Sequence, residues 1–416
     1  MVVGALRGGE QRVAGYGVLD AGRQPPDEHS IFEIGSVTKV FTTLVLADMV
    51  LGGEVALDDP AQKYLPSTVQ MPTWRGQEIT LLHLATHTSS LPRLPSNLSK
   101  TIKDQANPYA NYQVGDMYEF FSGYKLRRPI GSREEYSNLG MGLLGHVLGL
   151  VAGKSYEDLV SERILRPLAL NDTSITLNPD QQTRQAPGHT SDGKGTANWD
   201  TPALPGCGAL RSTMNDVLSF MAASMNPATS PLAQPVRFCQ RLYPKTAKPR
   251  LSWKAYSVAL VLSGLSVLLQ WYFGLIPGNG RFALAAFMPM LLAAYYGGLG
   301  PGLLATVATV AGTYALQHEQ NLAWWVGLLL GGITSLAVSR RPGLRDRGAM
   351  LAWQHRRLFP FDRGPRMVWH NGGTGGYASF VGFVRETEAA VVVLANSEKS
   401  VDSVGVDVLK LLNQET

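Results

Sequence analysis

Two periods of hydrophobic and polar positions along this chain predict strands at both ends and helices between them. Alternating positions predict strands over 2–6 and 11–19, and again over 349–354, 366–370, 377–384 and 388–395. Helical spacing predicts helices over 36–50, 80–87, 139–151, 155–169, 210–225 and 400–413. The strands at 377–384 and 388–395 have the pattern of neighbours in one sheet.

A third pattern, long and almost purely apolar, interrupts this arrangement. From Ala255 through Ser339 the only formally charged residues are Arg281 and Glu319. The block divides into candidate membrane spans at 255–276, 282–298, 301–317 and 323–339, each close to the ~17–25 residues that cross a bilayer. An even number of spans returns the chain to the side it left. The sequence therefore predicts a first part over 1–236, a transmembrane insertion over 237–349 and a second part over 350–416.

The formal net charge of +5 is informative mainly because the basic residues are unevenly distributed along the chain. Six basic residues and no acid lie between 237 and 254, and four arginines with one aspartate lie between 340 and 347. This excess flanks the apolar block, where anionic lipid headgroups would lie, so it predicts a lipid bilayer as partner and no nucleic acid. Basic flanks on both sides favour a cytoplasmic position for the rest of the chain, whereas cell-wall substrates would place it outside.

The start of the chain adds one expectation about targeting. Met1 runs into a strand-like pattern without the apolar segment of a secretory signal. Either an export signal is missing from this sequence or the internal block directs the chain to the membrane. We therefore expect a multi-pass membrane protein.

Candidate chemistry begins at Ser36-Val37-Thr38-Lys39, at the start of the 36–50 helix. Positions i and i+3 share a helix face, so the Lys39 amine can reach the Ser36 hydroxyl and take its proton. The helix start also offers free N–H groups to a developing oxyanion. A second Ser-x-x-Lys, Ser191 to Lys194, lies in a polar, Gly-rich stretch that predicts a loop.

A second candidate element is Tyr136-Ser137-Asn138, at a turn into the 139–151 helix. A tyrosine there can relay a proton, and an asparagine amide can hold a substrate carbonyl. The same spacing occurs at Tyr109-Ala110-Asn111, in a polar stretch over 93–115 that we interpret as a loop over the site. The apolar helix that follows Tyr136 favours the first copy.

A third element, His370-Asn371-Gly372-Gly373, lies between two predicted strands. Its glycines would let a substrate backbone lie close to the strand edge, and Gly373 N–H could join that of Ser36 at an oxyanion. The alternatives are a Gly-rich hairpin with a solvated histidine, or a phosphate loop. The latter lacks a following helix and a Gly-Lys-Ser/Thr ending.

Metal ions and cofactors are not expected. The spacing of His83 and His87 would suit a metal pair, but no third ligand is evident. The two cysteines, Cys207 and Cys239, give neither a disulfide framework nor a zinc pattern.

Together, the three elements resemble the serine β-lactamase and penicillin-recognising hydrolase superfamily, in its class C-like branch. That family carries Ser-x-x-Lys, Tyr-x-Asn and a Lys/His-x-Gly element on a strand edge, in this order. The resemblance covers about 1–236 and 350–416 and extends to longer stretches around the motifs, at 32–42, 84–92, 136–140 and 370–377.

The resemblance implies an α+β fold, with an antiparallel sheet flanked by helices, a helical subdomain and the active site between them. It implies that Ser36 is the acylated nucleophile and that Lys39 and Tyr136 share its proton and activate the deacylating water. It also implies an oxyanion hole from the N–H groups of Ser36 and Gly373. The substrate-binding residues would be Asn138, His370, Asn371 and Gly372.

The chain differs from that family at three points. His370 stands where β-lactamases of this type usually carry lysine, which is typical of peptidase and esterase members. The helix that the family has before its first strand is not present in this sequence. The apolar insertion has no counterpart in the family and resembles the four-helix membrane region of bacterial potassium-responsive sensor histidine kinases, without kinase motifs.

We therefore predict a membrane-anchored serine hydrolase that acts through an acyl-enzyme on peptide, β-lactam or ester bonds. The alternative is a penicillin- or muropeptide-responsive membrane sensor that is acylated but does not turn over. A hydrolase that has lost its activity and serves as a membrane scaffold is a third reading, which three intact motifs disfavour.

Overall fold

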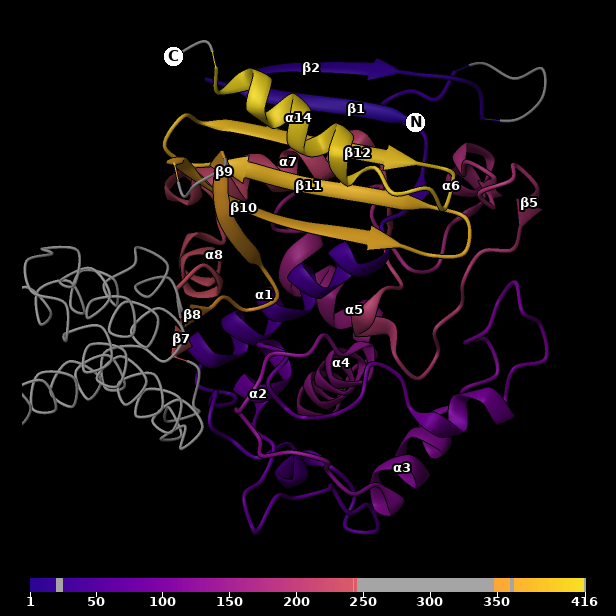
Figure 1. Ribbon diagram of the computed structural model, residues 1–416, viewed down its shortest axis with the longest axis vertical. Coiled ribbons are helices and arrows are strands. Elements are labelled where there is room, and N and C mark those ends of the chain that lie inside the picture. Colours follow the sequence, from indigo (N-terminus) through magenta and orange to yellow (C-terminus); the bar gives the residue numbers. More distant parts are fainter. Residues whose placement is uncertain (20–24, 242, 245–347, 360–362, 415–416) are drawn as a thin grey trace, which may run out of the picture. The chain divides into compact units, whose positions relative to one another are not determined.

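The computed structural model describes residues 1–19, 25–241, 243–244, 348–359 and 363–414 (Figure 1). The chain divides into two units, Met1–Thr246 with Gly348–Thr416, and Ala247–Arg347. The first unit holds all the described residues.

A six-stranded antiparallel sheet joins the two ends of the chain (Figure 1). Its first strand pairs with its last, with Val2 opposite Leu394, so the predicted N- and C-terminal strands form one sheet. In spatial order the strands are β2 (Glu10–Gly15), β1 (Val2–Arg7), β12 (Ala389–Ala395), β11 (Ala378–Val384), β10 (Arg363–Gly373) and β9 (Gln354–Phe359). The expected pairing of the strands at 377–384 and 388–395 is confirmed.

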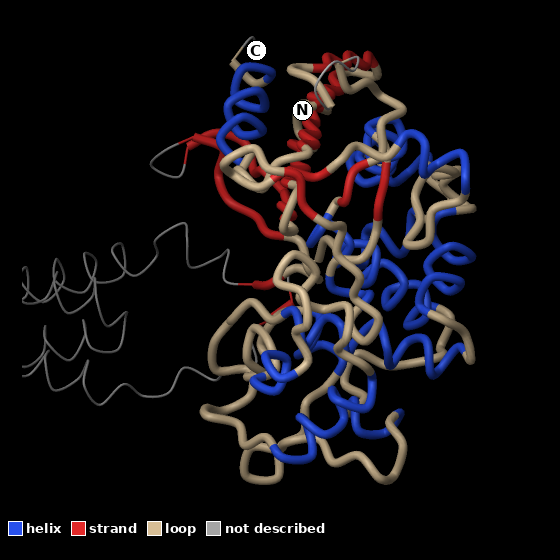
Figure 2. Tube along the Cα trace, turned by 90° about the vertical axis from the view of Figure 1, so that its right-hand side faces the viewer, coloured by secondary structure: helices blue, strands red, loops and turns tan. Residues whose placement is uncertain are grey.

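Helices cover both faces of the central strands. Every residue of β11 and β12 is buried, which requires apolar cover on both sides. Helix α14 (Asp402–Leu412) packs on one face and α7 (Met214–Met225) on the other. Figure 2, turned by 90°, shows α14 on one side of the strands and the remaining helices on the other. On the α14 side a Cβ atom on Gly405 would lie 2.1 Å from Phe380, so glycine permits this close packing.

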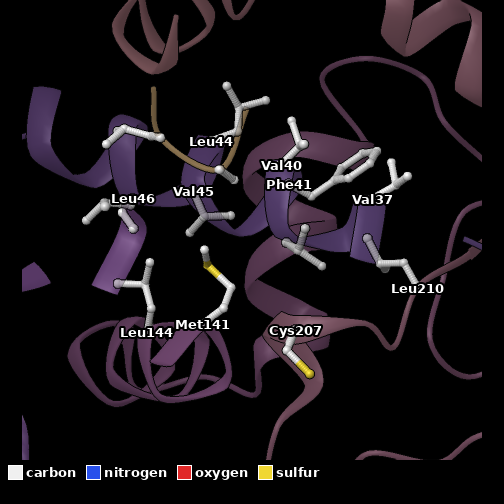
Figure 3. Packing of buried hydrophobic residues seen from close by; sticks show 14 of the residues in the cluster. Val37, Val40, Phe41, Leu44, Val45, Leu46, Met141, Leu144, Cys207 and Leu210 are labelled. Carbon is white, nitrogen blue, oxygen red and sulfur yellow. The ribbon is translucent and has the colours of Figure 1, made fainter. Parts of the chain in front are cut away.

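Helix α1 (Thr38–Leu51) is the centre of the helical part. Its residues from Thr38 to Ala47 are all buried, so the helix is covered on all sides rather than exposed along one face. Figure 3 shows its side chains packed against α4 (Asn138–Ala152) and the segment that holds Cys207. Gly145 lets that segment approach α4, because a Cβ there would lie 2.9 Å from the Gly206 Cα.

Shorter elements complete the unit. The remaining helices are α2 (Leu81–Ala85), α3 (Val114–Gly123), α5 (Tyr156–Val160), α6 (Pro179–Arg184) and α8 (Ala233–Cys239). The remaining strands are the pairs β3 (Phe32–Glu33) with β6 (Arg211–Ser212), β4 (Gly188–His189) with β5 (Gly195–Thr196), and β7 (Tyr243–Pro244) with β8 (Gly348–Ala349).

Several predicted boundaries were wrong, and three of them have a clear local reason. The strand expected over 349–354 is only the short β8, because the chain turns at Ala352, whose φ is 57°, before β9 begins. The helix expected from Leu210 begins at Met214, because Thr213 Oγ1 accepts the Asp216 N–H at 3.3 Å and caps it. The helix expected over 155–169 ends as a π-helix over Ser161–Leu165.

The predicted membrane insertion falls mainly outside this description. Among the residues that the structure describes, no helix is long and apolar enough to cross a bilayer. The four expected spans at 255–276, 282–298, 301–317 and 323–339 lie outside the described residues.

Candidate active site

Ser36 and Lys39 form a hydrogen-bonded pair at the start of α1. Ser36 lies in a 3₁₀ turn over Gly35–Val37 that leads directly into the helix. Lys39 Nζ donates to Ser36 Oγ at 2.8 Å and to the Cys207 carbonyl at 2.5 Å. The Lys39 side chain has no exposed surface, whereas Ser36 is partly exposed. The predicted spacing thus brings a buried amine to an accessible hydroxyl.

The end of β10 meets this turn backbone to backbone. A Cβ atom on Gly372 would lie 2.1 Å from the Ile34 carbonyl oxygen, and one on Gly35 would lie 2.7 Å from Gly373 N. Gly35 also has a φ of 48°, in the left-handed region that favours glycine. Ser379, on the neighbouring strand, donates to the Ile34 carbonyl at 2.8 Å. The glycines therefore let the backbone at Ser36 and the backbone at Gly373 lie against each other.

Tyr136 lies beside the pair. Lys39 Nζ is 4.8 Å from the centre of its ring, and the Arg93 guanidinium carbon is 5.4 Å from it. The ring is held by the start of α4, where Ser137 accepts the Gly140 N–H at 2.9 Å and donates to the Pro92 carbonyl at 2.7 Å. The first two sequence elements therefore meet as predicted.

Two buried histidines flank Tyr136. The ring centres of His87 and His370 lie 4.6 Å and 6.4 Å from that of Tyr136. His370 Nδ1 faces the Asn371 carbonyl at 2.6 Å, so Nδ1 carries the proton, whereas His87 Nδ1 accepts the Ser137 N–H at 3.2 Å, so Nε2 carries it. Burial, with the nearby Lys39, lowers the pKa of each histidine to about 3. Both imidazoles are therefore neutral at pH 7.

Asn138 and Tyr109 lie together beside this cluster. The Asn138 N–H donates to the Arg93 carbonyl at 3.0 Å. Burial raises the pKa of Tyr109 to about 12, and a hydrogen bond from the Asn138 side chain opposes this rise. Asn138 Oδ1 is buried and has no partner among the described residues. The second Tyr-x-Asn copy, Tyr109-Ala110-Asn111, therefore does not form a site of its own. Its tyrosine contacts the site around Ser36 from the 93–115 loop, which was expected to cover that site.

The Asn371 side chain lies away from the other predicted residues. Its amide donates to the Asp402 carboxylate of α14 at 2.8 Å. Side chains alternate between the two faces of a strand, so Asn371 points away from the face on which His370 and Gly372 lie. The Asn371 side chain therefore ties β10 to α14, and the role of this residue in substrate binding stays a prediction.

His83, His87 and Lys194 were the other candidates from the sequence, and their contacts are as follows. His83 Nδ1 pairs with Thr80 at the start of α2, at 2.9 Å from its hydroxyl, whereas His87 follows the end of that helix with a φ of 56°. Among the described residues no group of three or more potential metal ligands occurs. Lys194 lies in an exposed turn and pairs with Asp192, as expected for a loop.

Sequence reasoning missed three residues near the centre. His87 was considered only as a metal ligand, because a helix was expected to continue through it. The buried Glu33 lies 3.4 Å from Arg211 and accepts the Trp199 N–H at 2.9 Å. A charged residue inside the apolar stretch before Ser36 was the one available signal for this ion pair. Burial raises the pKa of Glu33, and Arg211 opposes that rise.

Comparison with known proteins agrees with this geometry. The family model described as Beta-lactamase matches residues 1–414. The D-alanyl-D-alanine-carboxypeptidase/endopeptidase AmpH of Escherichia coli K12 is 36% identical over 221 residues, which are 51% of this chain and 54% of that protein. A Beta-lactamase of the same strain is 29% identical over 252 residues, 59% of this chain and 62% of that protein.

Solved structures give the same fold. A Beta-lactamase/D-alanine Carboxypeptidase from Yersinia pestis, complexed with citrate, aligns over 100% of this chain and 92% of its own, with a TM-score of 0.66 and 20% identity. A class C β-lactamase aligns over 100% and 90%, with a TM-score of 0.65 and 16% identity.

The chain therefore belongs to the Beta-lactamase family and has the class C-like serine hydrolase fold. The relatives named above are carboxypeptidases and β-lactamases. By sequence, the chain spans just over half of the length of the curated relatives it matches.

Proposed function

We propose that this protein is a serine hydrolase that forms an acyl-enzyme on Ser36 and cleaves D-amino-acid peptides, β-lactams or small esters. The observation that carries the proposal is the 2.8 Å hydrogen bond between Lys39 Nζ and Ser36 Oγ. Among the described residues no carboxylate pairs with Lys39, whose other hydrogen bond goes to a carbonyl. An amine so placed can act as the base that makes a serine nucleophilic. The names of the matching relatives support the same chemistry.

The reaction would proceed in two steps. Ser36 Oγ forms a bond to the acyl carbon while its proton passes to Lys39 or Tyr136, and that proton then reaches the leaving amine or alcohol as its bond to the acyl carbon breaks. A water then loses a proton to the same groups and attacks the ester, and that proton reaches Ser36 Oγ as its bond to the acyl carbon breaks. The N–H groups of Ser36 and Gly373 would stabilise the oxyanion in both steps.

The substrate contacts would differ from those of lysine-bearing relatives. Asn138 Oδ1, buried without a partner among the described residues, is suited to accept a substrate N–H. His370 is neutral at pH 7 and would contribute a hydrogen bond rather than a charge. This favours peptides and esters over substrates that depend on a cation at that position.

Labelling with two active-site probes tests the proposal. We expect a fluorescent penicillin and a fluorophosphonate both to label the wild type and neither to label Ser36→Ala. Ser191→Ala, in the exposed second Ser-x-x-Lys, is the matched control and should label normally. Labelling that persists in Ser36→Ala would remove Ser36 from the mechanism.

Turnover separates the enzyme from the sensor alternative. After a pulse of fluorescent penicillin, an enzyme loses its label as water hydrolyses the acyl group, and it releases more than one equivalent of product. A protein that keeps its label after a long chase with unlabelled substrate would instead fit the membrane sensor.

We also propose that residues 255–339 hold the chain in a bilayer, with the hydrolase unit on the cytoplasmic side. The support is the apolar run itself and the basic residues that flank it. A reporter enzyme fused after Thr416 should then be active in the cytoplasm. Activity only on the outer side would overturn this orientation.

A further inference from the structure

A buried ion pair lies just before the turn that carries Ser36. Glu33 of β3 and Arg211 of β6 are opposite each other in these two paired strands, and both side chains are buried. Arg211 Nη2 is 3.4 Å from Glu33 Oε1. Apolar residues of similar size often replace such a pair without loss of stability. The pair is therefore better explained by what it holds in place.

The ion pair holds the backbone of Trp199 at both of its polar groups. The Trp199 N–H donates to Glu33 Oε1 at 2.9 Å, and Arg211 Nη2 donates to the Trp199 carbonyl at 3.3 Å. Residues 197–201 belong to neither a helix nor a strand. These two hydrogen bonds therefore fix a loop that has no regular hydrogen-bond pattern of its own.

This loop packs against the turn between β10 and β11. A Cβ atom on Gly375 would lie 2.7 Å from Trp199 Nε1, so the indole lies directly against the turn. Beside Trp199, Asn198 Oδ1 accepts the Tyr377 hydroxyl at 2.8 Å. The turn is closed by the Thr374 N–H, which donates to the Tyr377 carbonyl at 3.0 Å. The loop thus supports the turn at two of its residues.

The turn in turn holds the end of β10, which is paired on one side only. The pairing with β9 ends at Trp369, whereas the pairing with β11 continues to Gly373. Among the described residues, residues 370–373 therefore have a strand partner on the β11 side alone. Gly373 directly precedes the turn, and its N–H is one of the two proposed oxyanion donors. The position of that N–H therefore depends on the turn.

We propose that Glu33 and Arg211 are positioning residues, which hold the Gly373 N–H at the oxyanion by keeping Trp199 against the β10–β11 turn. The proposal rests on the acyl-enzyme function proposed above and adds to it the support of the oxyanion hole. Glu33 lies three residues before Ser36, so one short strand leads to both oxyanion donors. Loss of this support should weaken stabilisation of the transition state, where the oxyanion develops.

Two variants break the arrangement at different points. Glu33→Gln keeps the shape of the side chain and removes the charge that pairs with Arg211, which retains Asp200 at 3.7 Å. Gly375→Ala leaves the ion pair intact and adds a Cβ atom 2.7 Å from Trp199 Nε1. We expect each variant to lower kcat/KM on nitrophenyl acetate by about tenfold or more, because a misplacement of about 1 Å can cost about 100-fold.

A second readout separates positioning from simple loss of folded protein. Methylboronic acid should form a tetrahedral adduct on Ser36 that places an oxygen in the oxyanion hole, so its Ki should rise by a factor similar to the loss in kcat/KM. Active sites are counted by titration with the fluorophosphonate, so unfolded molecules do not contribute. Gly195→Ala in β5, where a Cβ atom meets nothing within 4 Å, is the matched control and should change neither value.

The double variant tests whether both changes act through Trp199. Its loss in kcat/KM should be smaller than the product of the two single losses, because the two changes disturb the same contact. Losses that multiply fully would overturn the proposal, as would a Gly375→Ala protein with unchanged kcat/KM and Ki, a result that decides the matter even if Glu33→Gln does not fold. A wild type that neither probe labels would instead overturn the proposed function.

Discussion

Gly35 and Gly373 meet so closely that no side chain fits between them. A Cβ atom on Gly35 would lie 2.7 Å from the N atom of Gly373 and 3.0 Å from its carbonyl oxygen. Through this contact the turn that carries Ser36 and the end of strand β10 become one wall of the pocket. The position of Ser36 therefore depends on a strand that lies more than 300 residues away in the sequence.

Substitution of Gly372 should lower activity strongly and stability only modestly. In Gly372→Ala the new Cβ would lie 2.1 Å from the Ile34 carbonyl oxygen and 2.9 Å from Ser36 N, so β10 must move away from the nucleophile. We expect kcat/KM to fall by about 100-fold or more, as when an oxyanion donor is lost, and the free energy of unfolding to fall by about 1–3 kcal/mol.

The matched control is Gly115→Ala in α3, where a Cβ atom meets nothing within 4 Å. It should keep full activity, and the helix should become slightly more stable. Esterase assays and urea unfolding of both variants check this, and a fully active Gly372→Ala would contradict the oxyanion arrangement.

The two Tyr-x-Asn copies can be distinguished by removal of their hydroxyl groups. Tyr136→Phe keeps the ring between His87 and Lys39 but removes the proton relay, so we expect kcat to fall by about 10²–10⁴-fold. Tyr109→Phe removes only a hydrogen bond to Asn138, and should reduce kcat/KM by less than about tenfold. Steady-state kinetics on one ester measures both. Equal losses in the two variants would place Tyr109 in the reaction itself.

The buried amine of Lys39 should lower the stability of the folded protein. Lys39 is wholly buried, and among the described residues its amine bonds to a hydroxyl and a carbonyl and lies 4.8 Å from the centre of the Tyr136 ring. Lys39→Met keeps the length of the side chain and removes an amine from an apolar site, so Tm should rise while probe labelling of Ser36 disappears. Lys63→Met, at an exposed ion pair with Asp59, is the control and should label normally. A clear fall in the Tm of Lys39→Met would show that the amine stabilises the fold.

The two neutral histidines predict a loss of stability in acid. The folded pKa of each is about 3 and the unfolded value is near 6.5, so the unfolded chain binds more protons between these values. The contribution of each neutral imidazole is therefore present above pH 6.5 and is lost as pH falls toward 3. His370→Asn should flatten the decline by up to about 1.4 kcal/mol per pH unit.

The measurement is urea unfolding of the wild type and His370→Asn from pH 7 to pH 4. The difference between the two is diagnostic, because the raised pKa of Glu33 acts with the opposite sign in both proteins. Parallel curves for the two proteins would mean that His370 is not held neutral in the folded state.

The sequence predicted most strands of the main sheet, most helices and the meeting of Ser36, Lys39 and Tyr136, because these follow from local periodicity and from motifs with a fixed order. It could not predict contacts that depend on tertiary packing. His87 comes into the site through a left-handed turn after a helix of only five residues, which no periodicity indicates. The orientation of the Asn371 side chain could not be predicted, because a Gly-rich motif does not show which face of the strand each side chain takes. Trp199 and Glu33 meet across 166 positions.

The short ladder between β7 and β8 has a consequence for how this chain can be engineered. Tyr243 lies opposite Ala349 and Pro244 opposite Gly348, so the backbone departs from the hydrolase unit and re-enters it at one spot. Lengthening a connection between ends that are already adjacent costs little entropy, only about 0.6 kcal/mol for each doubling. The chain can therefore be shortened at this ladder. A tight turn could replace everything between Pro244 and Gly348 and leave the hydrolase unit as a separate protein.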